Sequence, residues 1–292
     1  MESLWLPLTL LCAFALATSD ALAKRALASH NEYLVLWLRL LFALPLLFAA
    51  LPFVTVPPLS RDFFTASLMA LPLEALAALL YVRALRLSPL SLTLPFLALT
   101  PVFLLVIPYL LLGERITPVG GAGIILVAAG SYVLNLNEGG KGLLAPLRAI
   151  RHEPGSLCMI GVALIYSVTS TLGKKAVTAS APLFFSLCYL PALTLLLTPV
   201  ALWGGRRELK SMAKSGILRA AALPGLLYGV MFLSHMTAVS LTNVAYMIAV
   251  KRTSLLMGVL YGHLLFREPG IRHRLPGALL MVAGVALIAT GW

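Results

Sequence analysis

Residues Leu90–Leu112 read LSLTLPFLALTPVFLLVIPYLLL, and residues Pro118–Leu136 read PVGGAGIILVAAGSYVLNL. Neither stretch holds a charged residue, and only the five residues from Gly113 to Thr117 separate the two. A helix that crosses the hydrocarbon core of a bilayer needs roughly 20 apolar residues. The two stretches therefore predict consecutive membrane-spanning helices with a short connection.

The rest of the chain has the same character. Of its 292 residues, 60% are hydrophobic and 11% are charged, and the mean hydropathy is +0.97. Soluble domains are far richer in charge, so this composition excludes soluble, disordered, fibrous and disulfide-rich secreted proteins. The net charge of +12 would suggest a nucleic-acid partner in a soluble protein. In a membrane protein it concerns orientation instead, and we expect no nucleic-acid partner.

The same criterion predicts ten spans and an all-α membrane protein. The spans are Leu4–Leu22, Tyr33–Val54, Phe63–Leu85, Leu90–Leu112, Pro118–Leu136, Ser156–Val177, Pro182–Trp203, Leu218–Ser240, Asn243–Phe266 and Leu275–Trp292. Together they leave no room for a soluble domain. Residues 4–18 are also compatible with a signal peptide, but Glu2 stands where such peptides carry positive charge. We therefore favour a retained first helix.

The chain divides into two similar halves, residues 1–136 and 156–292, joined by a linker at 137–155. The matching residues are Glu114 with Glu268, Gly123 with Gly277 and Gly130 with Gly284 at a shift of 154 residues, and Lys24 with Lys174 at a shift of 150. Each half holds five predicted spans, an odd number, so the second must enter the membrane upside down. Two inverted five-helix repeats are typical of secondary transporters, whose substrate sites lie near the membrane midplane.

Basic residues gather on one side of the predicted membrane. The connections after spans one, three, five, seven and nine hold fifteen Lys and Arg residues, whereas the other connections hold four. The positive-inside rule places the fifteen in the cytoplasm and both termini outside, in a plasma or inner membrane. In the linker, apolar and basic residues interleave, which predicts a short helix on the membrane surface.

The end of each half carries a recognisable pattern. The first copy is Pro101-Val, Leu-Leu-Gly113-Glu114-Arg115-Ile-Thr117, Gly121, Gly123 and Gly130, and the second is Gly262, Phe266-Arg267-Glu268, Gly277 and Gly284. The pattern resembles the EamA repeat of the drug/metabolite transporter superfamily, although Arg267 replaces the usual glycine and Leu255 stands where Pro101 does. The resemblance covers nearly the whole chain. It implies a secondary transporter of a small organic solute, with a cavity lined mainly by spans 1, 3, 4, 6, 8 and 9, but it selects no substrate.

Three ionisable residues lie deep inside predicted spans, where charge is costly and usually functional. Lys251 and Arg252 are eight and nine residues into span nine, and Glu74 is eleven residues into span three. Lysine supplies a point charge and arginine a planar fork suited to carboxylate or phosphate, which favours an anion site. The pair also resembles the Lys-Arg of span nine in plastidic phosphate translocators, where it contacts the anionic substrate. The alternative is a structural ion pair with Glu74, which would neutralise only one cation.

Glu74 has two interpretations. It is either a proton-coupling carboxylate or a fixed counter-ion to Lys251 or Arg252, and the two nearby cations favour the counter-ion. Arg39, only six residues into span two, is expected to extend to the cytoplasmic interface. Asp20 is expected to pair with Lys24, four residues further along the same helix.

Polar residues in other spans complete the predicted site. His235, Tyr166 and Tyr246 are candidates for lining the cavity. Glu114, Arg115 and Glu268 lie at span ends and are expected to act as gates or braces. The three cysteines lie in apolar runs without metal-ligand spacing, so no metal or cofactor is expected.

Transport leads among three hypotheses. The substrate class that fits the Lys-Arg pair is a small anionic or zwitterionic metabolite, exported or exchanged by alternating access. An intramembrane enzyme acting on lipid-linked phosphates is an alternative, but no known catalytic motif appears. A non-transporting membrane subunit is a third possibility. The sequence does not indicate an oligomeric state.

Overall fold

The computed structural model describes residues 4–87, 94–134, 136, 154–212, 214–266 and 271–291. Within these ranges the chain is helical and holds no strand. The helices are α1 (Trp5–Leu27), α2 (Glu32–Ala49), η2 (Leu51–Phe53), α3 (Arg61–Leu87), η3 (Leu94–Ala98), α5 (Leu99–Phe103), α6 (Ile107–Leu112), α7 (Pro118–Leu134), α9 (Pro154–Thr178), α10 (Pro182–Gly204), α11 (Arg206–Leu209), α12 (Ile217–Leu241), α13 (Val244–Lys251), α14 (Ser254–Phe266) and α15 (Ile271–Gly291). Glu268 and most of the 137–155 linker lie outside the described residues.

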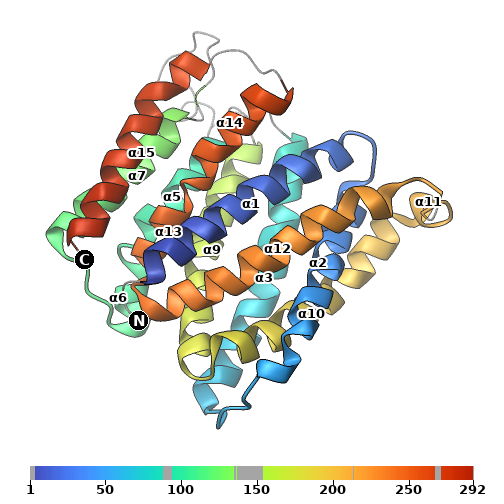
Figure 1. Ribbon diagram of the computed structural model, residues 1–292, viewed down its shortest axis with the longest axis horizontal. Coiled ribbons are helices and arrows are strands. Elements are labelled where there is room, and N and C mark those ends of the chain that lie inside the picture. The colour runs from blue at the N-terminus through green and yellow to red at the C-terminus, as the bar shows by residue number, and fades with distance from the viewer. Residues whose placement is uncertain are drawn as a thin grey trace.

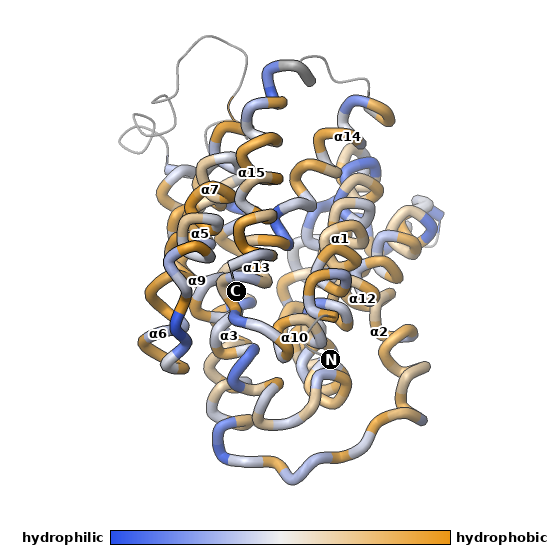
Figure 2. Tube along the Cα trace, turned by 60° about the vertical axis from the view of Figure 1, so that its left-hand side comes forward, coloured by the Kyte–Doolittle hydropathy of each residue, from blue (hydrophilic) through white to orange (hydrophobic). Residues whose placement is uncertain are grey.

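Length and composition mark the protein as a multi-pass membrane protein. Within the described ranges, eight helical stretches are long and apolar enough to cross a bilayer, and Phe96–Leu112 and Pro118–Leu134 are shorter apolar stretches. Figure 2 shows hydrophobic residues along the helices and hydrophilic ones gathered towards many helix ends. The number of crossings, ten, stays a prediction.

Helices of the two halves pack against each other in pairs. The closest pairs are α7 with α15, α3 with α9, and α1 with α12, and each joins one half to the other (Figure 1). Helix α2 packs against α12 and α10. The two halves are therefore interleaved, and residues from both meet in the middle of the bundle.

Glycines bring α7 and α15 into backbone contact. A Cβ atom on Gly123 would lie 2.7 Å from the carbonyl oxygen of Gly284, and one on Gly284 would lie 2.6 Å from that of Gly123. Gly130 and Gly277 approach each other in the same reciprocal way. Small residues of this kind let membrane helices meet closely. Because the pairs match at the 154-residue shift, the contact has the two-fold symmetry expected of inverted repeats.

Spans four and nine are broken, although the sequence predicted each as one helix. Span four is divided into η3, α5 and α6, where Pro101 and Pro108 lack the N–H group that continues a helix. Span nine is divided at Arg252 and Thr253 without a proline. There Thr253 N and Leu255 N bond the carbonyls three residues earlier, at 3.0 and 2.9 Å, and the Thr253 hydroxyl donates to Val250 O at 2.8 Å. The break therefore falls directly on the Lys-Arg pair.

Candidate functional site

A cluster of polar side chains lies between the helices in the middle of the bundle, and we call it the central cluster. Its members are Asp20 of α1, Arg39 of α2, Glu74 and Tyr81 of α3, Tyr166 and Thr169 of α9, Tyr228 and His235 of α12, and Lys251 and Arg252 at the α13–α14 break. Most of these side chains are half-buried, so they keep surface accessible to water although helices surround them. Both repeats contribute to the cluster.

Lys251 is the last residue of α13, and it extends towards α12. Its Nζ lies 3.0 Å from Nδ1 of His235. An ammonium group has donors only, so Nδ1 accepts this hydrogen bond and the ring proton sits on Nε2. His235 is buried, with 8% of its surface exposed. The predicted lining residue His235 is thus a neutral partner that leaves the charge of Lys251 in place.

Glu74 lies beside Thr169 of α9 and near enough to Lys251 to interact with its charge. The Thr169 hydroxyl itself donates to Tyr166 O at 3.4 Å. Within the described residues no direct ion pair joins Glu74 to Lys251 or Arg252. The carboxylate is therefore a nearby opposite charge, and the direct structural pair that the sequence left open does not form.

Arg252 caps the C-terminal end of α13 and lies near the hydroxyls of Tyr166 and Tyr81. Its Nε is buried and has no hydrogen-bond partner in the structure. A buried donor without an acceptor is unfavourable by about 1–3 kcal/mol. Consecutive residues of a helix point about 100° apart, and Lys251 lies towards α12 whereas Arg252 lies towards α3 and α9. The two cations therefore present different sides of the cluster.

Arg39 points towards α1 and α12, and its predicted reach to the membrane interface stays a prediction. Its Nη1 lies 2.6 Å from Oδ1 of Asp20, and its guanidinium stacks over the ring of Tyr228 at 4.4 Å. Only 16% of the Arg39 side chain is exposed, against 54% for Asp20. The structure pairs Asp20 with Arg39, and the predicted contact of Asp20 with Lys24 stays a prediction. An acid and a base at similar depth in successive spans were the signal for this pair.

Glu114 and Arg115, which were predicted to act as gates or braces, lie near the C-terminal end of α9. Glu114 forms an ion pair with Lys174 and accepts a hydrogen bond from Val244 N at 3.0 Å. Lys174 also donates to Thr242 O at 2.7 Å. Arg115 contributes its backbone, because its carbonyl accepts from Asn243 Nδ2 at 3.0 Å while its side chain is exposed. These contacts tie the end of α6 to the start of α13, and Lys174 is a functional candidate that the sequence analysis had not singled out.

Tyr246 belongs to this end of the bundle and not to the central cluster. Only 2% of it is exposed, and its hydroxyl accepts a hydrogen bond from Thr117 N at 3.0 Å. A Cβ atom on Gly120 would lie 2.4 Å from this hydroxyl. The tyrosine therefore fills the contact between α13 and α7, away from the central cluster, and its predicted role in binding stays a prediction.

A row of aromatic rings runs from the start of α3 towards the central cluster. Phe63 and Phe185 have ring centroids 6.5 Å apart, Phe185 and Tyr189 4.9 Å, and Tyr189 and Phe232 6.4 Å. Tyr189 lies close enough to Glu74 and Tyr228 to interact with them. The rings and the Glu114–Lys174 contacts fill the bundle between the cluster and the predicted outer surface.

Equivalent positions of the two repeats both contribute to the cluster. At the 154-residue shift, Glu74 corresponds to Tyr228 and Tyr81 to His235. The Lys-Arg pair corresponds to the apolar residues Leu97 and Ala98. The positions are thus symmetric, whereas the charges are not. No group of His, Cys, Asp or Glu in the described ranges could hold a metal ion.

Comparisons with known proteins agree with this architecture. The sequence model of the EamA-like transporter family matches residues 3–136 and 153–290. A solved structure described only as "Crystal structure of protein" is similar, with a TM-score of 0.75 and 17% identity over 98% of this chain and 96% of that one. At this identity the likeness concerns the fold alone. No curated protein matches the chain.

Proposed function

Because the chain belongs to the EamA-like transporter family, we propose that it carries a small anionic organic solute across the membrane, with Lys251 and Arg252 as the residues that bind the anion. The family makes the protein a membrane transporter of the drug/metabolite transporter superfamily, which favours transport over the intramembrane enzyme and the non-transporting subunit. The anionic charge of the solute, export or exchange as the direction, and the cytoplasmic assignment of the basic end are our proposals.

The observation that carries the proposal is the state of the two cations. Lys251 has a neutral histidine as its hydrogen-bond partner, and Arg252 has a buried Nε without one. An anion bound in the cluster would neutralise charge inside the bundle, which makes binding favourable. A carboxylate or phosphate suits the planar guanidinium best.

The helix break places the pair where transporters commonly bind substrates. Discontinuous helices near the midplane expose backbone groups and end charges to a solute. Here α13 ends at Lys251, and the carbonyls of its last turn accept hydrogen bonds from Arg252 N, Thr253 N and the Thr253 hydroxyl. Lys251 and Arg252 therefore stand at a tightened turn between two helices.

Alternating access would follow from movement of the repeats relative to each other. The Glu114–Lys174 pair and the row of aromatic rings close one end of the bundle in this structure. We propose that these contacts open when the solute is released on that side, as the gating role of Glu114 and Arg115 requires. The glycine contact between α7 and α15 lies on the local two-fold axis and supplies a fixed point for the movement.

Glu74 acts in this proposal as the counter-ion of Lys251 in the empty transporter. It lies near Lys251 and forms no direct ion pair with it among the described residues. A solute anion would take over the neutralisation of Lys251. Proton coupling through Glu74 is the alternative, and it predicts that a proton gradient drives uptake.

The experiment is exchange transport in proteoliposomes loaded with candidate carboxylates, amino acids or phosphate esters. We expect saturable uptake of an anionic solute, and a loss of about 10- to 100-fold in Lys251→Ala and in Arg252→Ala, since each removes a charge-assisted hydrogen bond. Arg83→Ala is the matched control, because Arg83 is an exposed cation of α3 outside the central cluster. Wild-type uptake in both cluster variants would refute the anion site.

A further inference from the structure

A second site of positive charge lies far from the central cluster, where α10 ends. A pocket of about 490 Å³ opens there, lined by Asn31, Trp203, Gly204, Gly205, Arg206, Arg207 and Glu208. It joins the α1–α2 connection of one repeat to the α10–α12 connection of the other. The transport proposal does not use these residues.

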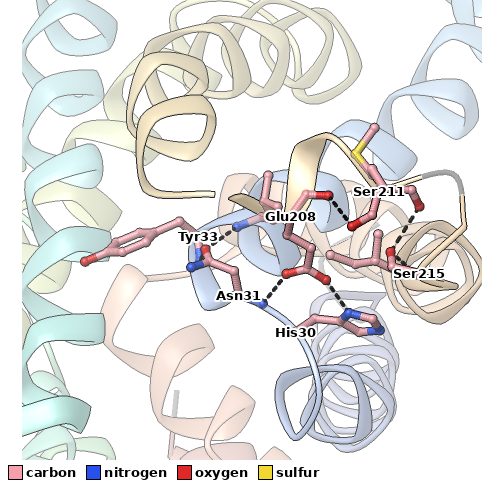
Figure 3. A network of polar contacts seen from close by, with 9 residues as sticks. His30, Asn31, Tyr33, Glu208, Ser211 and Ser215 are labelled. Carbon is pink, nitrogen blue, oxygen red and sulfur yellow. Dashed lines mark hydrogen bonds and ion pairs between the residues drawn. The ribbon is translucent and has the colours of Figure 1, made fainter. Parts of the chain in front are cut away.

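The pocket is built on a fixed frame. Glu208 binds His30 Nδ1 with one carboxylate oxygen and accepts from Asn31 N at 2.8 Å with the other, as Figure 3 shows. The side chain of Asn31 caps α2 through Tyr33 N at 3.0 Å. A Cβ atom on Gly205 would lie 2.2 Å from the Leu34 side chain, so the end of α10 is pressed against α2. These contacts hold the walls of the pocket in place.

The charge of the pocket is positive, because its lining holds two arginines and one carboxylate. Both oxygens of Glu208 have partners, whereas Arg206 and Arg207 are exposed and have no ion pair among the described residues. The same connection carries the exposed cations Lys210, Lys214 and Arg219 and no other acid. An anion is therefore the ligand that the pocket favours.

The apolar surface beside the pocket indicates where this anion comes from. Trp203 is 77% exposed, and Leu195 and Leu202 of the same helix are 72% and 42% exposed. In a helix that crosses a membrane, this surface faces lipid, and tryptophan is typical of the level of the lipid headgroups. The two arginines follow Trp203 after Gly204 and Gly205, which places them at the depth of lipid phosphates.

We propose that this pocket binds the headgroup of an anionic phospholipid, with Arg206 and Arg207 on the phosphate and Trp203 beside the glycerol. Arginine forks match phosphate geometry, and basic pockets between membrane helices commonly take such headgroups. The bound lipid would join the two repeats at the end of the bundle that carries the basic connections. The proposal does not depend on which solute the central cluster carries.

The test is thermal unfolding of the purified, detergent-solubilised chain during titration with short-chain phosphatidylglycerol. A ligand that binds the folded state raises the unfolding midpoint in a saturable way. We expect phosphatidylglycerol to do so, and phosphatidylcholine of the same chain length and inorganic phosphate to have little effect. Equal stabilisation by phosphatidylcholine or by inorganic phosphate would overturn the proposal.

Two double variants remove the same charge at different places. The double variant Arg206→Ala with Arg207→Ala should weaken the apparent affinity for phosphatidylglycerol about 30-fold, because each basic residue near the membrane surface contributes about fivefold. Lys214→Ala with Arg219→Ala, outside the pocket, should change it less than about threefold. All four residues are exposed, so both variants should unfold like the wild type without lipid. If the affinity for phosphatidylglycerol falls equally in the two double variants, the lipid is attracted by the overall positive charge of this end, and the proposed pocket is refuted.

Discussion

The breaks in spans four and nine occupy equivalent positions of the two repeats but have opposite chemistry. In the first repeat, η3 ends at Ala98, and Leu97 packs in an apolar cluster with Met159 and Val162 of α9. In the second repeat, α13 ends at Lys251, and Arg252 follows with a free buried donor. One break is covered by apolar side chains, and the other places two cations between the helices.

The difference separates what the fold requires from what the function requires. Both repeats break this span, so the interruption belongs to the shared architecture. Only the second repeat places charged residues at the interruption, and burying that charge is costly. A feature that is costly and present in one copy alone is best explained by a ligand, which is why the anion proposal rests on the second break.

The largest effect is expected where the repeats are most alike. Gly123→Ala and Gly284→Ala should each destabilise the protein by more than about 3 kcal/mol, because the new Cβ would overlap a backbone oxygen of the facing helix. Equal damage from the two repeats would confirm that they are equivalent here. The measurement is the unfolding midpoint together with size-exclusion behaviour.

Gly161→Ala is the control for these variants, since a Cβ there meets nothing within 4 Å. Alanine favours a helix by about 1 kcal/mol over glycine, so this variant should be neutral or slightly more stable. Loss of stability in Gly161→Ala as large as in Gly123→Ala would contradict the close-contact explanation.

The contact that joins the repeats at the start of α13 comes next. Glu114→Gln should destabilise the protein by about 3 kcal/mol, because it leaves Lys174, only 14% exposed, without its carboxylate. Asp62→Asn removes the partner of the neighbouring Lys175. Because that ion pair is exposed, this variant should lose only about 0.5 kcal/mol of stability. Thermal unfolding of the two variants should therefore differ clearly, and similar midpoints would refute a structural role for the Glu114 pair.

Conservative changes at the two breaks sharpen the comparison further. Arg252→Lys keeps the charge but loses the planar fork, so transport should fall about tenfold through a higher KM. Leu97→Met, beside the equivalent position in the first repeat, should change KM less than about twofold because it preserves volume. The initial rate of solute exchange in proteoliposomes measures both. Equal KM values for Arg252→Lys and the wild type would exclude bidentate binding.

The smallest effect is expected at Glu74. Glu74→Gln removes the charge that partly neutralises Lys251, so the affinity for the anion should increase, by about threefold for a modest electrostatic interaction. Exchange in the absence of a proton gradient should persist. If Glu74 instead couples protons, the variant will lose uptake driven by a pH gradient while exchange stays unchanged, and the counter-ion interpretation fails.

The sequence predicts the long helices well, because apolarity in a bilayer is a local property. The span predicted at Leu218–Ser240 is α12, Ile217–Leu241. The break in span four follows from its prolines, but the break in span nine has no such signal. The contacts of Arg39 with Asp20 and of Tyr246 with Thr117 were not predicted, because the direction of a side chain depends on which helices become neighbours, and that is decided by packing between the repeats.

The central claim is that the charged break of the second repeat binds an anion, and ligand-induced stabilisation tests it most directly. The purified chain is unfolded thermally with a panel of carboxylates and phosphate esters, each beside a neutral analogue of the same size. The account predicts that at least one anion raises the midpoint of the wild type and of Leu97→Met in a saturable way, and that Lys251→Ala and Arg252→Ala lose this response. Equal stabilisation of Lys251→Ala, Arg252→Ala and the wild type by the same anion, or a response to the neutral analogues alone, would contradict it.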